Sequence, residues 1–400
     1  MVEQSKPMSK LAGILLCLMC LGFMNQGTII ALILFAVIIV EKHGRISVGK
    51  WSEFVTISLF AISFISFGVI GGVHTAYTGI LLPIGYCIGA SFEYKESKDI
   101  DNVVLLMALS MDMHLILNLI YELLRFGFSF RLTAIHYDIW SGQNISATGA
   151  MVNATAFLGC VYYLIFKGNR QKRIIGIALL ITNTLYDLIM GGRSFLVILV
   201  AGIIVGFLTD AIRSNGIGSA LRKILLIGSV LAVVIVAGIF VLRTNTAFQS
   251  FFEDTYFYKR FFRENAYENI LTTGRTNLRD IYVSNMWEYP FGGRKIWNIA
   301  HQYAHELYLD IYDIGGIVPY ILIIIFVIQS VLNCFKFAKS KILEQETQIL
   351  LIGFVTCINI QFFIEPVLSG APILLVVYCV FVGYISKATK VARQMQNKLN

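Results

Sequence analysis

Long apolar runs alternate with short polar segments along almost the whole chain. Because about 20 apolar residues in a helix cross a hydrocarbon core of about 30 Å, runs of this kind predict membrane-spanning helices. Tight turns are predicted at Gly71-Gly72, Gly191-Gly192 and Glu365-Pro366. The twelve predicted spans are 9–24, 27–41, 53–71, 77–92, 102–123, 147–166, 172–190, 193–210, 221–242, 314–335, 346–364 and 371–386. The pattern predicts an all-α, polytopic membrane protein.

Composition supports this class and excludes others. The 400 residues are 57% hydrophobic and only 14% charged, with a mean hydropathy of +0.72, whereas a soluble domain carries roughly 25% charged residues. The net charge of +8 does not indicate nucleic-acid binding, because no basic stretch is interleaved with exposed aromatic residues. Lys and Arg are common in the cytoplasmic loops of membrane proteins.

The seven cysteines carry little chemical information. All of them lie in apolar runs, and the Cys17–Cys20 pair, which has the spacing of a redox or metal motif, falls within the first predicted span. We interpret them as small apolar residues.

Charge along the chain predicts its orientation. Most of the 32 Lys and Arg residues fall in segments that share one side with both termini, which places the termini in the cytoplasm. The long polar interval then lies on the outer face. The predicted organisation is nine helices over 1–242, one large outer loop over 243–313, and three helices with a basic cytoplasmic tail over 314–400.

A second outer segment, 125–144, is aromatic and basic. The favoured interpretation is an aromatic belt that anchors the chain at the membrane surface, with snorkelling arginines. The functional alternative is that the segment forms part of the rim of a groove for a lipid substrate.

Arginines recur beside glycines in or near the outer loop. Arg193 follows Gly191-Gly192 in an almost uncharged surrounding, and Arg294 follows Gly292-Gly293. Arg275 follows Gly274, and Arg279 would lie one helical turn later on the same face of a helix. A guanidinium group suits phosphate oxygens, and glycine lets the backbone approach a ligand. The alternative is that these arginines pair with acids of the same loop.

Two histidines follow in the same loop. His301 and His305 are four residues apart, so on a helix they would share one face. The spacing approaches the H-E-x-x-H motif of zinc proteases, but Gln302 stands where the catalytic glutamate belongs, which argues against a metalloprotease. The alternative is that these histidines are ordinary membrane-interface residues.

The order of these features resembles the bacterial O-antigen polymerase and O-antigen ligase family. The shared features are Gly192-Arg193-Ser194 opening a helix on the outer face, Thr-Gly-Arg at 273–275 in a large outer loop, His-x-x-Tyr-Leu at 305–309, and Gly315-Gly316 before the next span. Glu306 departs from the pattern, since many relatives carry asparagine after this histidine.

The resemblance implies a glycosyltransferase in the bacterial inner (plasma) membrane, with an active site that faces the periplasm or the cell exterior. Its substrate would be a polyprenyl-pyrophosphate-linked oligosaccharide repeat unit, and its reaction would invert the anomeric centre without a cofactor or metal. A chain-length regulator protein and membrane lipid are the expected partners. His305 would act as the base; Arg193, Arg275 and Arg279 would hold the pyrophosphate; and the sugar would meet His301, Glu306, Tyr308 and Arg294.

Three functions remain open. A repeat-unit polymerase is the first, and a ligase that moves finished polymer to a lipid or protein acceptor would use the same residues. The third is a transporter or flippase for lipid-linked sugar. Against a transporter, the sequence has no internal repeat and no broken mid-membrane helix, and its charges cluster at the outer face rather than in mid-span.

Overall fold

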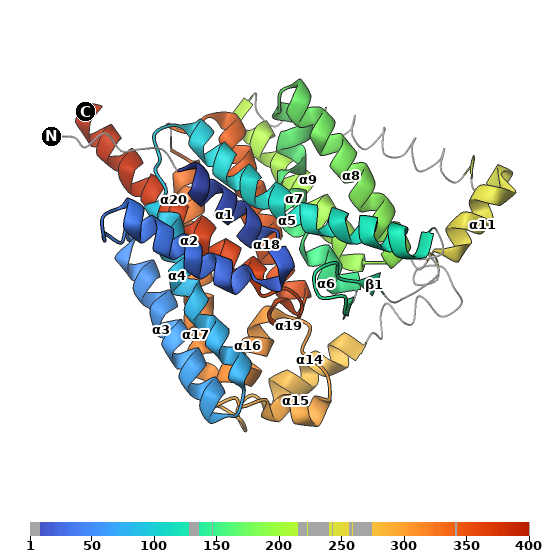
Figure 1. The fold of residues 1–400 in the computed structure, drawn as a ribbon, viewed down its shortest axis with the longest axis horizontal. Helices are drawn as coiled ribbons and strands as arrows, with labels where there is room; N and C mark the ends of the chain where they lie inside the picture. The colour runs from blue at the N-terminus through green and yellow to red at the C-terminus, as the bar shows by residue number, and fades with distance from the viewer. Residues whose placement is uncertain are drawn as a thin grey trace.

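The computed structural model describes most of the chain, and this part is almost entirely helical (Figure 1). The described residues are 9–127, 136–145, 147–214, 243–255, 274–340 and 342–399, with the single positions 222, 240, 241 and 258. Strand appears there only as a short antiparallel hairpin of β1 (His136–Tyr137) and β2 (Asn144–Ile145). The all-α prediction is confirmed for these residues.

Seven helices in the described ranges are long and apolar enough to cross a membrane. They are α3 (Trp51–Ile70), α5 (Ser97–Phe126), α8 (Arg170–Met190), α9 (Arg193–Ser214), α17 (Ile317–Ala338), α18 (Gln345–Ile364) and α20 (Ile373–Leu399). The chain is therefore an α-helical membrane protein.

Shorter helices pack around these seven or connect them. Those within predicted spans are α1 (Lys10–Cys20), α2 (Gly27–Glu41), α4 (Leu81–Ser91), α6 (Ala147–Val152) and α7 (Thr155–Tyr162). The 3₁₀ helices η1 (Phe23–Asn25) and η2 (His74–Ile80) and the π-helical turn η4 (Tyr163–Lys167) overlap the ends of predicted spans. The connecting helices are α11 (Thr246–Asp254), α14 (Gly274–Asn285), α15 (Lys295–Ala300), α16 (Leu307–Gly315) and α19 (Val367–Gly370).

Most of the predicted spans that the structure describes overlap a single helix, but twelve crossings stay a prediction. α1 has 11 residues and is therefore about 16 Å long, roughly half the thickness of a hydrocarbon core. The prediction of one helix over 147–166 is wrong, because α6 ends at Val152 and α7 begins at Thr155. The ninth span, 221–242, falls almost wholly outside the described residues.

Glycines let the central helices touch along their backbones. α20 packs against α4, where a methyl group added at Gly89 or Gly383 would overlap a carbonyl of the facing helix. Gly159 of α7 and Gly353 of α18 face each other in the same way. Inside a membrane no hydrophobic force holds helices together, so such close contact is a main source of their attraction.

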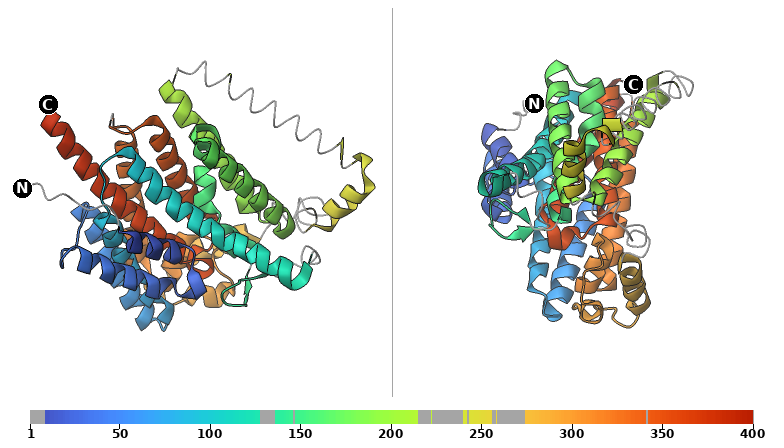
Figure 2. Two further views of the ribbon diagram at one scale, coloured as in Figure 1. Left: turned by 45° about the horizontal axis from the view of Figure 1, so that its top comes forward. Right: turned by 90° about the vertical axis from the view of Figure 1, so that its right-hand side faces the viewer.

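Many helices run between two opposite ends of the bundle (Figure 2). At one end, Lys42 lies 2.8 Å from Glu93, and Lys167 lies 2.7 Å from Asp210. The opposite end holds the turn after α3, the β1–β2 hairpin and helices α14, α15, α16 and α19. The predicted grouping of the loops, and the assignment of the first end to the cytoplasm, stay predictions.

A polar pair joins α5 and α8 between these ends. Asp112, near the middle of α5, is fully buried and accepts hydrogen bonds from Asn183 Nδ2 of α8 at 2.9 and 3.1 Å. The expectation that charged side chains avoid mid-span is therefore wrong at Asp112, because Asn183 supplies a donor there.

Candidate functional site

Two adjoining cavities lie at the end of the bundle that holds α15, α16 and α19. The larger has a volume of about 340 Å³ and the smaller about 250 Å³. Phe64, Thr78, Leu368 and Pro372 line both. Together they reach the size of sites that bind small molecules, so we take this pair of cavities as the candidate site.

The backbone of Gly292, Gly293 and Arg294 carries the Arg294 side chain to the smaller cavity. All three residues have positive φ angles, of 72°, 76° and 54°. The N–H of Gly293 donates to the carbonyl of Ile314 at 3.0 Å, and the N–H of Arg294 donates to the carbonyl of Asp313 at 2.7 Å. The left-handed conformation suits glycine and costs a side-chain-bearing residue energy. These two hydrogen bonds hold the turn against the end of α16.

Asp313 fixes helix α15 beside this turn. Its Oδ1 accepts the N–H groups of Ile296 and Trp297, both at 3.1 Å, and so satisfies donors that the first turn of a helix leaves free. Burial raises the pKa of Asp313, and the two backbone donors and Arg294 lower it by less. Asp313 is therefore a structural support that also lines the smaller cavity.

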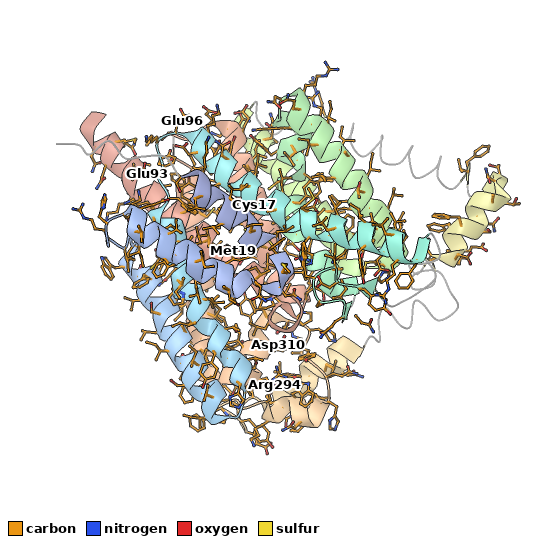
Figure 3. The ribbon with its side chains drawn as sticks, in the orientation of Figure 1. Cys17, Met19, Glu93, Glu96, Arg294 and Asp310 are labelled. Atoms are coloured by element: carbon orange, nitrogen blue, oxygen red, sulfur yellow. The ribbon has the colours of Figure 1, made fainter. Side chains whose placement is uncertain are left out.

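Asp310 faces the same cavity in a more protected position. Its Oδ1 accepts the N–H of Ala304 at 3.3 Å, and only 5% of the residue is exposed. Burial raises the pKa of Asp310 to about 7, against the lowering effects of the Ala304 N–H and of Arg294. The charge of the smaller cavity therefore changes near neutral pH. Arg294 and Asp310 lie at this end of the molecule in Figure 3.

An aromatic ring beside Arg294 forms a further part of the wall of the smaller cavity. The Arg294 guanidinium lies over the Tyr303 ring, 5.7 Å from its centroid, and both side chains line the cavity. A cation over an aromatic face is attracted by the ring and held in place. The cavity thus combines a fixed guanidinium, a partly exposed ring and two carboxyl groups.

One face of α5 holds the β1–β2 hairpin beside the larger cavity. His114, Asn118 and Glu122 are four residues apart and so lie along one side of the helix. Asn118 Oδ1 accepts the N–H of Ile139 at 2.9 Å, and Glu122 accepts the N–H of Tyr137. His114 makes the third contact, with Asp138.

The contact between His114 and Asp138 is an oriented pair at the cavity wall. Nε2 of His114 lies 2.6 Å from Oδ1 of Asp138, and both residues line the larger cavity. Oδ2 of Asp138 accepts the N–H and O–H of Ser141 at 2.7 and 2.9 Å. Burial by itself raises the pKa of Asp138, but the hydrogen bonds from His114 and Ser141 outweigh it and lower the pKa to about 2. Asp138 is therefore ionised at neutral pH.

The two predicted histidines do not share a helix. His301 follows α15 as its C-cap with a φ of 55°, and His305 lies two residues before α16 with a φ of 60°. The prediction that they share one helical face is wrong, because the chain leaves the helical conformation between them. Neither histidine lines the two cavities.

Arg279, Glu306 and Tyr308 come together outside the cavities. Burial raises the pKa of Glu306, and the nearby positive charge of Arg279 partly opposes that rise. Tyr308 is 5% exposed and packs on Phe363 with ring centroids 4.8 Å apart. Of the residues predicted to bind sugar, Arg294 lines the smaller cavity, and His301, Glu306 and Tyr308 line neither of the two cavities.

Arg193 and Arg275 are described by their backbones, and their side chains lie outside the described part of the structure. Arg193 begins α9, as predicted, and the preceding Gly192 lies against Met151 of α6. Arg275 and Arg279 both fall in α14, which confirms the predicted helix for this pair.

Sequence reasoning missed His114, Asn118, Glu122 and Asp138. The first three lie in or next to an apolar run, where each reads as an isolated polar residue. Their regular spacing of four residues was the available signal, since it predicts a polar stripe on one helix face. Asp138 and Asn144 do fall in the segment 125–144, for which a groove rim was the functional alternative, and both line the larger cavity.

Within the described ranges, no group of three or more His, Cys, Asp and Glu side chains is placed to hold a metal ion. No protein-family model matches this chain, and no curated protein matches it significantly.

Proposed function

We propose that this protein is a glycosyltransferase that joins polyprenyl-pyrophosphate-linked oligosaccharide repeat units, as an O-antigen or surface-polysaccharide polymerase does. The observation that carries the proposal is the pair of adjoining cavities at one end of the apolar helix bundle. Joining two lipid-linked sugars requires neighbouring places for a donor and an acceptor beside a membrane, and this arrangement offers them.

The smaller cavity suits the donor pyrophosphate. Arg294 provides a planar guanidinium that can bind phosphate oxygens and stabilise the charge that develops on a leaving pyrophosphate. Tyr303 beside it provides an aromatic face for a sugar ring or for the guanidinium itself. This chemistry needs no metal or cofactor. Arg193, Arg275 and Arg279 remain proposed further contacts of the pyrophosphate, and His305 remains a proposed base.

The apolar surroundings suit the rest of the substrate. α3 and α17 contact each other and α16, so a polyprenyl chain could lie along the apolar helices while its pyrophosphate enters the cavities. The proposed location is the bacterial plasma membrane, with the cavities on the periplasmic or outer face. Single displacement at the anomeric carbon would invert its configuration. A chain-length regulator is the proposed protein partner.

Reconstitution tests the proposal directly. The purified protein is placed in vesicles with polyprenyl-pyrophosphate-linked repeat units, and the products are separated by size. We expect a ladder of polymers that disappears with Arg294→Ala. Vesicles that contain folded protein and yield no ladder would overturn the proposal. A cell that lacks a ligase would accumulate long polymer on the carrier lipid, whereas loss of this protein should leave single repeat units.

The buried Asp112–Asn183 pair favours one second candidate, a transporter for lipid-linked sugar. An ionisable side chain in mid-membrane commonly belongs to a path for ions or protons. In the same vesicles, a transporter would move the lipid-linked sugar across the bilayer without lengthening it, so the two candidates give different products.

A further inference from the structure

The imidazole of His114 has one nitrogen in contact with Asp138 and the other beside Gly22, at the wall of the larger cavity. Nε2 contacts the ionised carboxylate of Asp138 at 2.6 Å. A carboxylate only accepts hydrogen bonds, so Nε2 must carry the proton of the neutral imidazole. Nδ1 then carries a free lone pair and can accept a proton.

Gly22 keeps the space beside this nitrogen open. It adopts a φ of 62°, and a Cβ at this position would stand 3.3 Å from Nδ1 of His114. Gly22 and His114 both line the larger cavity, and 11% of the His114 side chain remains exposed although the residue lies within a membrane-spanning helix. The lone pair is therefore accessible from the cavity.

The larger cavity has the chemistry of a sugar subsite. Side-chain amides and hydroxyls line it beside the apolar surface of Phe60 and Phe64, whose rings stack 5.3 Å apart. Amides and hydroxyls both donate and accept hydrogen bonds, as sugar hydroxyl groups require. The amide and hydroxyl side chains available to hydrogen-bond a sugar in this cavity include those of Asn25, Thr28, Gln143, Asn144 and Asn153.

We propose that the larger cavity binds the acceptor sugar and that His114, oriented by Asp138, is the general base that deprotonates its hydroxyl group. This inference rests on the proposed glycosyl transfer and assigns the base to a residue other than His305. The same arrangement of a carboxylate, an imidazole and a reacting hydroxyl operates in other enzymes that activate a hydroxyl group.

The step balances as a single displacement. The acceptor oxygen forms a bond to the anomeric carbon of the donor sugar while its proton passes to Nδ1 of His114. The bond between that carbon and the pyrophosphate oxygen breaks, and the polyprenyl pyrophosphate leaves with the electron pair towards Arg294. The imidazolium formed is stabilised by the carboxylate of Asp138 and then loses its proton to water.

Asp138→Asn provides a sharp test of the orientation. Ser141 donates two hydrogen bonds to Oδ2, and Trp140 N–H a third at 3.1 Å, so an asparagine at 138 would keep its oxygen there. Its NH₂ group would then face Nε2 and donate to it, which moves the imidazole proton to Nδ1 and removes the base. Asp138 is thus a positioning residue. Its substitution should change the tautomer of His114, which nitrogen-15 NMR of labelled protein reports.

The activity test compares variants in the vesicle assay. We expect His114→Ala and Asp138→Asn to lower kcat at least about a hundredfold with little change in the KM for the donor. Added imidazole should partly restore His114→Ala and should not restore Asp138→Asn. His74→Ala is the control, because His74 lies in η2 outside both cavity walls.

A purely structural role for His114 would give a different pattern. Glu122→Ala removes another hydrogen bond that holds the same hairpin, and Glu122 does not line the cavity. If Glu122→Ala lost as much activity as His114→Ala, or if imidazole restored nothing, the base assignment would be overturned. If the wild-type protein forms a ladder and His114→Ala forms it equally well, the base assignment is refuted and the proposed function is not. Absence of a wild-type ladder would refute the proposed function, and the base assignment with it.

Discussion

Gly71, at the end of α3, lies directly against Gly293 in the turn that presents Arg294. A Cβ on Gly293 would stand 3.1 Å from Gly71 Cα, and a Cβ on Gly71 would overlap Gly293 Cα. The end of a membrane-spanning helix therefore packs backbone to backbone against the turn that carries Arg294. A side chain at either glycine would push the two apart.

Gly71→Ala tests whether this contact between Gly71 and Gly293 positions Arg294. Gly71 has a φ of −76°, so alanine fits its backbone and the penalty is only the collision with Gly293. Overpacking of this kind costs about 1–3 kcal/mol. We expect weaker donor binding with little loss of folded protein, measured as a higher KM in the vesicle assay. Ile70→Ala, at the exposed end of the same helix, is the control, and an equal effect there would contradict the interpretation.

Substitution of Arg294 tests the donor site. Loss of a charge-assisted hydrogen bond to the pyrophosphate should cost about 1.5–3 kcal/mol, which is roughly a tenfold to hundredfold weaker interaction with the donor. Arg294→Lys keeps the charge and loses the planar fork, so it should fall between wild type and Arg294→Ala. The measurement is kcat/KM for the donor. Equal values for the three proteins would show that the pyrophosphate binds elsewhere.

Donor binding should depend on pH through Asp310. Because the pKa of Asp310 is raised to about 7, raising the pH through 7 adds a negative charge beside Arg294 and should weaken binding of an anionic donor. The folded-state pKa lies above the unfolded value, so the same group makes the fold more stable as pH falls from about 7 towards 4.

Asp310→Asn is the matching variant, since it keeps the oxygen that accepts the Ala304 N–H. It should remove the change in donor affinity near pH 7, measured by titration of a fluorescent donor analogue. The ionisation of the pyrophosphate is common to both proteins and cancels in the comparison. Identical pH profiles would assign the titration to another group, such as Glu306 or Asp313.

Asp112→Asn separates the polymerase from the transporter. Asparagine can still accept the hydrogen bond from Asn183, so a structural role predicts a polymer ladder within about threefold of wild type, equivalent to less than about 1 kcal/mol. A transporter that uses the ionisable group would lose its activity completely. The measurement is polymer formation and lipid translocation in the same vesicles. Loss of the ladder from a folded Asp112→Asn protein would contradict the structural role.

The fold was largely predictable because its signal is local. Each apolar run forms its helix from its own residues, and turns at Gly71-Gly72 and Gly191-Gly192 end helices through local backbone conformation. Helix length was less predictable: α1 stops at Cys20 within a continuing apolar run, and α6 separates from α7 at Asn153, a polar residue in a run that predicts one span.

The candidate site was only partly predictable because its contacts join distant segments. Arg294 could be found from its glycine neighbours. The contact of His114 with Asp138 joins residues 24 positions apart, and it depends on how the β1–β2 hairpin folds back on α5. No spacing rule links these two residues. The helical continuity assumed between His301 and His305 fails because both residues adopt positive φ angles, which end one helix and separate it from the next.

The shared wall of the two cavities limits how such a protein can change its substrates. Phe64, Thr78, Leu368 and Pro372 border both cavities, so a substitution that reshapes one reshapes the other. Under the proposed function, donor and acceptor preference would then be inherited together. A variant that accepts a new repeat unit as donor would tend to recognise the same unit as acceptor, which suits a polymer whose successive units are alike.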